Sequence, residues 1–87
     1  MEQYVDVSAL EPPEPLEVIL DAIADLPPGD YLKVRHRRNP VPLYRMLSDM
    51  GYAYAMSSPA PGHFEILIWP KDLPPPPGVM PESENAE

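Results

Sequence analysis

Proline divides this chain into short segments. Fifteen of its 87 residues are proline, against an ordinary usage of about 5%. They fall in clusters at residues 12–15, 27–28, 40–42, 59–61 and 70–81. Proline has no backbone N–H and is excluded from helix interiors and central strands. Each stretch between two clusters therefore has room for about one helix or one strand.

The segments between the prolines show either the strand or the helix pattern. Strand alternation covers residues 4–7, 31–37, 52–56 and 64–69, and helical spacing of apolar residues covers 15–26 and 40–50. The connections through the helices allow parallel pairing, and the last two strands should form an antiparallel hairpin. The order βαβαββ predicts an α/β two-layer sandwich, with two helices on one face of a mixed four-stranded sheet.

One folded domain accounts for most of the chain, because a second core would have nothing to fill it. We expect this domain to span residues 1–72. Residues 73–87 have no apolar periodicity and end in acids, which predicts a proline-rich, acidic, disordered or polyproline tail. The first residues do not resemble a signal peptide, and no window approaches the ~18 apolar residues of a membrane span. We therefore expect a cytoplasmic protein that does not insert into membranes.

Charge and cysteine content exclude several classes of function. Fourteen acids against six bases give a net charge of −8, which argues against binding to nucleic acid or to anionic membranes. Cysteine is absent, so the chain has no thiolate nucleophile, disulfide or cysteine-ligated metal cluster. We expect no cofactor, no metal and no catalytic residue.

The bases are segregated along the sequence, because residues 33–45 hold five of the six and no acid. Strand alternation places Lys33, Arg35 and Arg37 on the sheet face opposite the helices, and Leu67 and Trp69 share that face. This open-face patch could bind a partner protein, the acidic tail or a single-stranded nucleic acid. The alternative is a solvated edge strand that its charges protect from aggregation.

A second candidate site is a cleft between the N-termini of the two helices. Its predicted residues are Glu11, Pro12, Pro13, Glu14, Pro15, His36, Pro40 and Pro42. The acidic, proline-bracketed loop could present carboxylates and free helix N–H groups to a ligand, or it could be a stiff entry loop with ordinary dipole complementarity. His36 with Glu11 or Glu14 could bind a small ligand or a metal. Two histidines without cysteine, and without HxH or HxxxH spacing, are a weak ligand set.

The first strand and the loop after it resemble the TusA-like (SirA-like) sulfur-carrier proteins. Asp6, Leu10 and the triplet Pro13–Pro15 align with that family, and its sulfur-carrying cysteine then falls on Pro12. The resemblance implies the TusA-like fold. It also implies that no persulfide can be carried here, because neither Pro12 nor any other residue supplies a thiol.

A closer resemblance is to a cysteine-less, TusA-related bacterial family of unknown function, over roughly residues 4–70. Its motifs stand here as Asp6, Leu10, Glu11–Pro15, Pro27–Gly29, His36, Pro40, Pro42 and Leu43. We therefore expect a noncatalytic accessory or binding module, with a protein partner or a small ligand. A small-ligand or metal-binding domain that uses His36 with Glu11 or Glu14 is the alternative. A domain of about 70 residues buries only ~60% of its unfolded surface, so either a monomer or a weak homodimer is expected.

Overall fold

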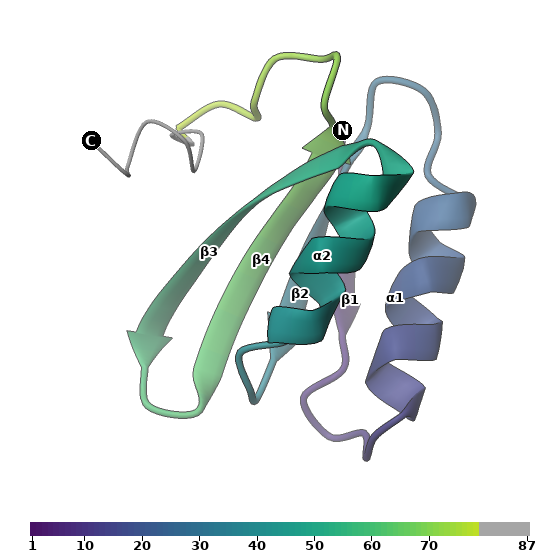
Figure 1. Cartoon of the computed structure of the whole chain (residues 1–87). Coiled ribbons are helices and arrows are strands. Elements are labelled where there is room, and N and C mark those ends of the chain that lie inside the picture. Colours follow the sequence, from purple (N-terminus) through teal and green to yellow (C-terminus); the bar gives the residue numbers. More distant parts are fainter. Residues whose placement is uncertain (79–87) are drawn as a thin grey trace.

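The computed structural model of the chain describes residues 1–78. Six elements follow one another along the sequence (Figure 1). They are β1 (Glu2–Asp6), α1 (Glu14–Ala24), β2 (Tyr31–His36), α2 (Val41–Met50), β3 (Tyr52–Ala60) and β4 (His63–Pro70). The predicted order of strands and helices is confirmed.

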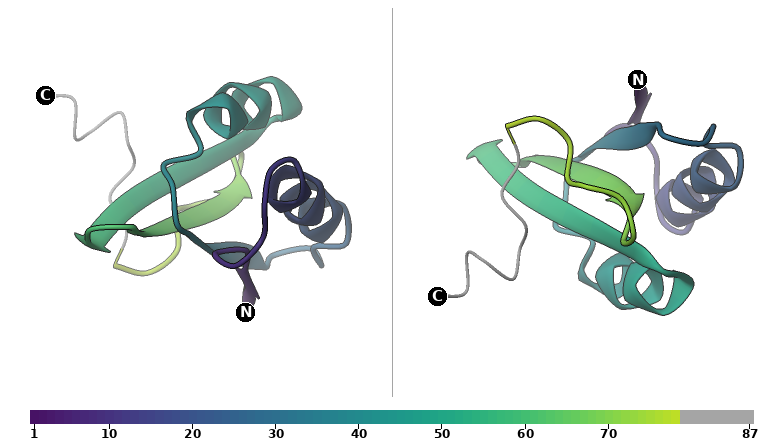
Figure 2. Two further views of the ribbon diagram at one scale, coloured as in Figure 1. Left: turned by 90° about the horizontal axis from the view of Figure 1, so that it is seen from below. Right: turned by 90° about the horizontal axis from the view of Figure 1, so that it is seen from above.

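The four strands form one mixed sheet in the order β1-β2-β4-β3. β1 and β2 are parallel, whereas β4 is antiparallel to both β2 and β3. Both helices lie on the same face of this sheet (Figure 2). The two-layer sandwich predicted from the sequence is therefore the observed architecture.

The hydrophobic core lies between the sheet and the two helices. Its buried members are Val7, Ile19, Ile23, Leu32, Val34, Leu43, Leu47, Ile66 and Ile68. The register explains why the strands contribute alternate residues, since Leu32 pairs with Ile68 and Val34 with Ile66 on the helix-facing side. Each such side chain contributes about 1.5–3 kcal/mol of transfer free energy on burial. The core is therefore the main source of stability in this small domain.

The position of β2 corrects one interpretation of the basic segment. β2 lies between β1 and β4, and the edges of the sheet are β1 and β3. The charges of β2 therefore do not protect an edge strand.

Strand β3 is longer than predicted, because it continues through Ser57 and Pro59 to Ala60 with an irregular register. An edge strand tolerates this proline, since its missing N–H costs no hydrogen bond to a neighbour.

Both helices begin next to prolines at the same end of the molecule. α1 has Pro15 in its first turn and Pro13 before it, and α2 has Pro42 in its first turn and Pro40 before it. Each helix follows one of the two parallel strands, so both helix N-termini lie at the end where β1 and β2 finish. This arrangement creates the cleft described below.

The chain after β4 crosses the sheet face opposite the helices (Figure 2). Residues 73–76 belong to no helix or strand, yet Pro76 is buried. The remainder of the predicted tail, residues 79–87, lies outside the described residues. The domain boundary at residue 72 stays a prediction.

No helix among residues 1–78 is long and apolar enough to cross a membrane.

Candidate functional site: an apolar cleft between two helix N-termini

A cleft of about 270 Å³ opens between the first turns of α1 and α2. Six of the eight residues predicted for this site line it, and three aliphatic residues of the helices complete its walls. The lining consists of Pro12, Pro13, Pro15, Leu16, Ile19, His36, Pro40, Pro42 and Leu43. Its walls are almost wholly apolar, and His36 is the one titratable group among them.

Proline gives the cleft a stiff rim on both sides. Pro12, Pro13 and Pro15 come from the loop and first turn of α1, and Pro40 and Pro42 from those of α2. Proline rings fix the backbone φ angle and lose little entropy when a ligand orders them. The cleft is therefore largely formed before anything binds to it.

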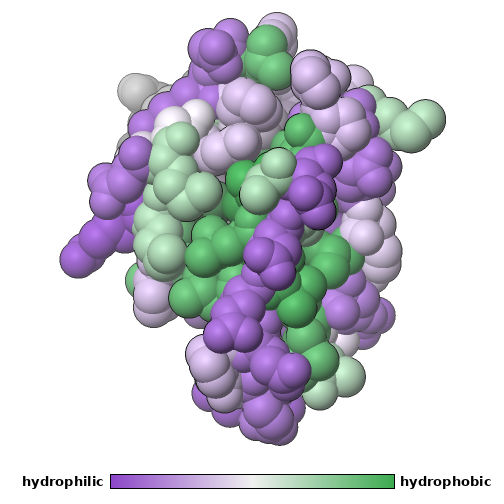
Figure 3. Space-filling view, turned by 90° about the vertical axis from the view of Figure 1, so that its right-hand side faces the viewer, coloured by the Kyte–Doolittle hydropathy of each residue, from purple (hydrophilic) through white to green (hydrophobic). Residues whose placement is uncertain are grey.

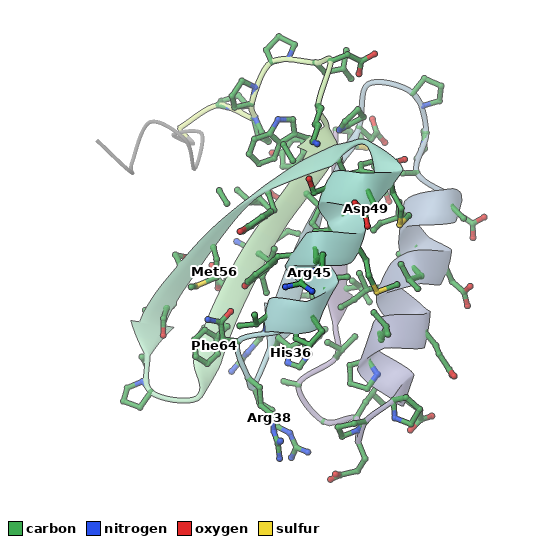
Figure 4. All side chains as sticks on the ribbon, in the orientation of Figure 1. His36, Arg38, Arg45, Asp49, Met56 and Phe64 are labelled. Atoms are coloured by element: carbon green, nitrogen blue, oxygen red, sulfur yellow. The ribbon has the colours of Figure 1, made fainter. Side chains whose placement is uncertain are left out.

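His36 reaches the cleft from the last position of β2. It pairs with Phe64 in the sheet register, which places it on the helix-facing side as predicted, and Figure 4 shows it below the first turn of α2. The backbone N–H of Arg38 donates a hydrogen bond to His36 Nδ1 at 3.1 Å. Nδ1 is therefore the acceptor, and any proton on the neutral ring lies on Nε2.

The electrostatic surroundings of His36 favour its neutral form. Partial burial lowers the pKa of the His36 imidazole below its ordinary value of 6.5, and the positive charges of Arg37 and Arg38 lower that pKa further. No ion pair involving His36 is found among residues 1–78. The cleft is consequently uncharged at neutral pH.

The two predicted acidic residues do not line the cleft. Glu11 extends outward to form an ion pair with Arg37, with 3.0 Å between Oε1 and the guanidinium Nη2. Glu14 is exposed on the first turn of α1. Within the described part of the chain, no three His, Asp or Glu side chains gather in a group that could hold a metal ion. The geometry therefore offers little support for a site built from His36 and these carboxylates.

Hydrophobic surface also continues beside the cleft on the helical side of the molecule. Figure 3 views the side that carries α1 and shows apolar side chains on both sides of a hydrophilic ridge. The exposed acids of α1 are Glu14, Glu17 and Asp21, and the exposed Asp25 follows its last residue. The apolar cleft is thus bordered by a negatively charged helix surface.

The predicted open-face patch is less basic than the sequence indicated. Lys33 and Arg35 lie on that face, but Glu65 of β4 lies opposite Arg35 and pairs with Lys33 at 3.6 Å between Nζ and Oε1. Asp6 of β1 lies beside Arg35 on the other side, and Arg37 is withdrawn into its ion pair with Glu11. Acids from both neighbouring strands therefore neutralise this stretch of β2.

The aromatic part of the same patch is covered. Trp69 lies on the open face as predicted, but only 4% of it is exposed. Leu67 is half-buried, and it lines a hollow together with Pro76 and Pro77. A nucleic-acid base could not stack on Trp69 while these prolines remain in place.

Sequence reasoning missed four contributors to these surfaces. Leu16, Ile19 and Leu43 were assigned to the helices but not to the cleft, although their helical spacing places them one turn from its prolines. Glu65 alternates with Phe64 and Ile66, so its place on the open face could have been found from strand periodicity. Its position beside Arg35 required the order of the strands.

Comparison with known proteins gives the family. No curated protein and no solved structure matches the chain. The family of uncharacterized conserved proteins DUF2249 matches residues 4–70, which include every element from α1 to β4, most of β1 and all the residues that line the cleft. The match covers well over half of the sequence, and the chain therefore belongs to the DUF2249 family.

Proposed function

We propose that this protein is a noncatalytic binding module, and that its cleft accepts a small apolar side chain from a protein partner. The observation that carries the proposal is the cleft itself, in which five prolines and three aliphatic residues surround one histidine whose surroundings lower its pKa. Burial of an apolar group here would contribute about 25 cal/mol per Å² of apolar surface removed from water. A polar or charged group would instead lose its hydrogen bonds to water and find few hydrogen-bonding groups in the cleft to replace them.

The size of the cleft supports a side chain over a cofactor. Its volume of about 270 Å³ is slightly below the range of roughly 300–1,000 Å³ that is typical of ligand and cofactor sites. It lies at the surface between two helix N-termini, where a protruding side chain of a partner can enter. The acidic surface of α1 beside it would favour a partner with basic residues around that side chain.

The residues of the cleft also support a role without catalysis. His36 is its one titratable group, and Nδ1 already accepts a hydrogen bond from the Arg38 backbone. No serine, threonine or carboxylate lines the cleft, so His36 has no nucleophile or second acid–base group beside it. We further propose descent from TusA-like sulfur carriers, with Pro12 in place of the carrier cysteine, so that the cleft binds a partner without transferring sulfur.

The proposal is tested by NMR with small probes of defined chemistry. Backbone signals of the labelled protein are followed while N-acetyl-leucinamide, and separately N-acetyl-glutamine amide, is added. We expect saturable shifts at residues 12–19, 36 and 40–43 with the leucine probe, and much weaker shifts with the glutamine probe. Equal shifts with both probes, or shifts scattered over the whole surface, would contradict the proposal.

Two matched variants separate the cleft from other apolar surfaces. Pro12→Asp places a charge on the exposed rim of the cleft, and Pro59→Asp places the same charge on the exposed β3–β4 hairpin. We expect Pro12→Asp to weaken the binding of the leucine probe at least about fivefold, which corresponds to a loss of about 1 kcal/mol of binding free energy. Pro59→Asp should bind as wild type does. If both variants bind the leucine probe with similar affinity, the probe binds at a surface other than the cleft.

A further inference from the structure

Trp69 is the most deeply buried aromatic residue, although no helix covers it. It lies on β4, on the sheet face opposite α1 and α2, with only 4% of its surface exposed. The segment that follows β4 provides the cover. A hollow of about 520 Å³ on this face is lined by Tyr31 and Trp69 on one side and by Leu73–Pro77 on the other. We call residues 73–77 the proline strap.

The chain just before the strap is fixed by hydrogen bonds to the end of α2. The Lys71 backbone N–H donates to the Gly51 carbonyl at 3.0 Å, and Lys71 Nζ donates to the Ser48 carbonyl at 3.1 Å and to the Ser48 hydroxyl at 3.2 Å. The carbonyls at a helix C-terminus favour such a cation. The Leu73 N–H then closes a turn onto the Pro70 carbonyl at 3.1 Å. This turn directs the strap back over the open face.

The strap meets the sheet through prolines and aromatic rings. Pro76 is buried, whereas Pro74 and Pro77 are exposed, so one edge of the strap contacts the sheet. Consecutive prolines favour the extended polyproline II conformation, in which the backbone makes no internal hydrogen bonds. Grooves lined by aromatic residues bind such segments because little conformational entropy is lost on docking. Tyr31 and Trp69 provide aromatic surface of this kind.

We propose that the open sheet face around Tyr31 and Trp69 is a groove for proline-rich segments, which the strap occupies from within the same chain. When the strap leaves, the groove would bind a proline-rich segment of another protein. The strap itself is the observation that identifies the occupant, because its four consecutive prolines lie along the groove and form one of its walls, with Pro76 buried. This groove lies on the opposite side of the sheet from the apolar cleft and does not depend on the function proposed for the cleft.

Because the strap is attached to the same chain, it competes strongly with a separate peptide for the groove. A short tether gives an attached segment an effective concentration in the millimolar range. A peptide that binds the groove with a similar intrinsic affinity must therefore exceed that concentration before it displaces the strap. Removing the prolines of the strap should make the groove available at much lower peptide concentrations.

The experiment uses Trp69 as its own reporter, since it is the single tryptophan of the chain. In the full-length variant Pro74→Ser/Pro75→Ser/Pro76→Ser/Pro77→Ser, we expect the fluorescence emission of Trp69 to move to longer wavelength as water reaches the indole. A synthetic peptide with the sequence of residues 71–78 should reverse that shift saturably. The same peptide with serine in place of its four prolines should not.

Three controls make the result decisive. Pro59→Ser/Pro61→Ser changes exposed prolines in the β3–β4 hairpin, which do not line the hollow, and should leave the emission of Trp69 unchanged. The single variant Pro76→Ser should give a smaller red shift in the same direction. NMR signals of the core residues verify that each variant is folded. If the quadruple variant is folded and its emission does not change, or if both peptides act equally, the proposal is wrong.

Discussion

His36 determines the charge of the apolar cleft. Its ring lines the cleft, while its Nδ1 accepts a hydrogen bond from Arg38 and two arginines follow it in the sequence. Partial burial is the largest cause of its lowered pKa, followed by the charges of Arg37 and Arg38. Protonation would place a positive charge between proline rings that cannot hydrogen-bond to it. The neutral imidazole is therefore the form that suits this site.

An NMR titration of the His36 ring tests this directly, and the expected midpoint lies below pH 6.5. Because the folded-state pKa is lower than the unfolded value, the unfolded chain binds this proton more tightly. The contribution of His36 to stability is therefore complete above about pH 6.5 and is lost as the pH falls through the folded-state pKa. Urea unfolding of wild type and His36→Gln at several pH values should show a difference that changes in this window. A midpoint at or above 6.5 would contradict the account.

Arg37 offers a second test at the level of single residues. Replacing Arg37 with Gln removes one positive charge that lowers the His36 pKa, so this pKa should rise toward its ordinary value. The ion pair with Glu11 is lost as well, but Glu11 is 75% exposed, and exposed pairs contribute at most about 1 kcal/mol. We expect a shifted His36 titration with little change in urea stability.

Arg45→Gln is the matched control for this variant, because Arg45 is an exposed arginine of α2 that is not among the causes of the lowered His36 pKa. Its histidine titration should match that of wild type. Equal shifts in both variants would mean that general charge, and not the neighbourhood of His36, sets the pKa.

At the level of elements, α2 depends on the glycine that ends it. Gly51 has a φ angle of 89°, in the left-handed region, and its N–H donates to the carbonyls of Leu47 and Ser48. No atom lies within 4 Å of a Cβ added there, so a side chain meets conformational strain and not a clash. Gly51→Ala should destabilise the protein by about 1 kcal/mol in urea unfolding. Asp49→Ala, two residues earlier on the exposed side of α2, should be close to neutral, and an equal loss in both variants would contradict this role of Gly51.

The elements themselves could be predicted because each carries a local signal. Prolines mark the starts of both helices, and Leu32 and Val34 alternate with charged residues along β2. Asn39 shows where such signals fail. Asparagine before a predicted helix is a preferred cap, yet the Asn39 side chain does not cap α2 and instead accepts a hydrogen bond from the Tyr44 hydroxyl at 2.6 Å. The cap position is taken by Pro40, whose side chain cannot accept a hydrogen bond from the helix N–H groups. The Asn39 oxygen is bound instead by the Tyr44 hydroxyl.

The candidate site was predicted in part, for a similar reason. Parallel strands bring the two helix N-termini together whatever their side chains are, so the prolines and His36 could be assigned to one cleft. The direction of Glu11 could not be predicted, because it depends on Arg37 from a distant part of the sequence. Strand order likewise decides that Glu65 lies beside Lys33 and Arg35, and periodicity within single strands carries no information about it.

Across the whole molecule, charge is distributed differently from its distribution along the sequence. Residues 33–45 hold five bases and no acid, but Lys33 pairs with Glu65 and Arg37 with Glu11. The net charge of −8 therefore includes a basic segment in which two of the five positive charges are paired with acids from neighbouring elements. The excess of acidic residues lies on other parts of the surface, including the exposed side of α1.

The two faces of the sheet should contribute unequally to the stability of the whole domain, and adjacent residues of β4 test this. Ile66 faces the helices and is fully buried, whereas Leu67 faces the strap and is half-buried. Ile66→Ala should cost about 2–5 kcal/mol through lost burial and the cavity left behind, out of a total of about 5–15 kcal/mol. Leu67→Ala should cost less than half as much in the same urea experiment, because water or the mobile ends of nearby side chains can fill the space. Equal losses would mean that the face covered by the strap is packed as tightly as the helical core, and that the domain has three layers and not two.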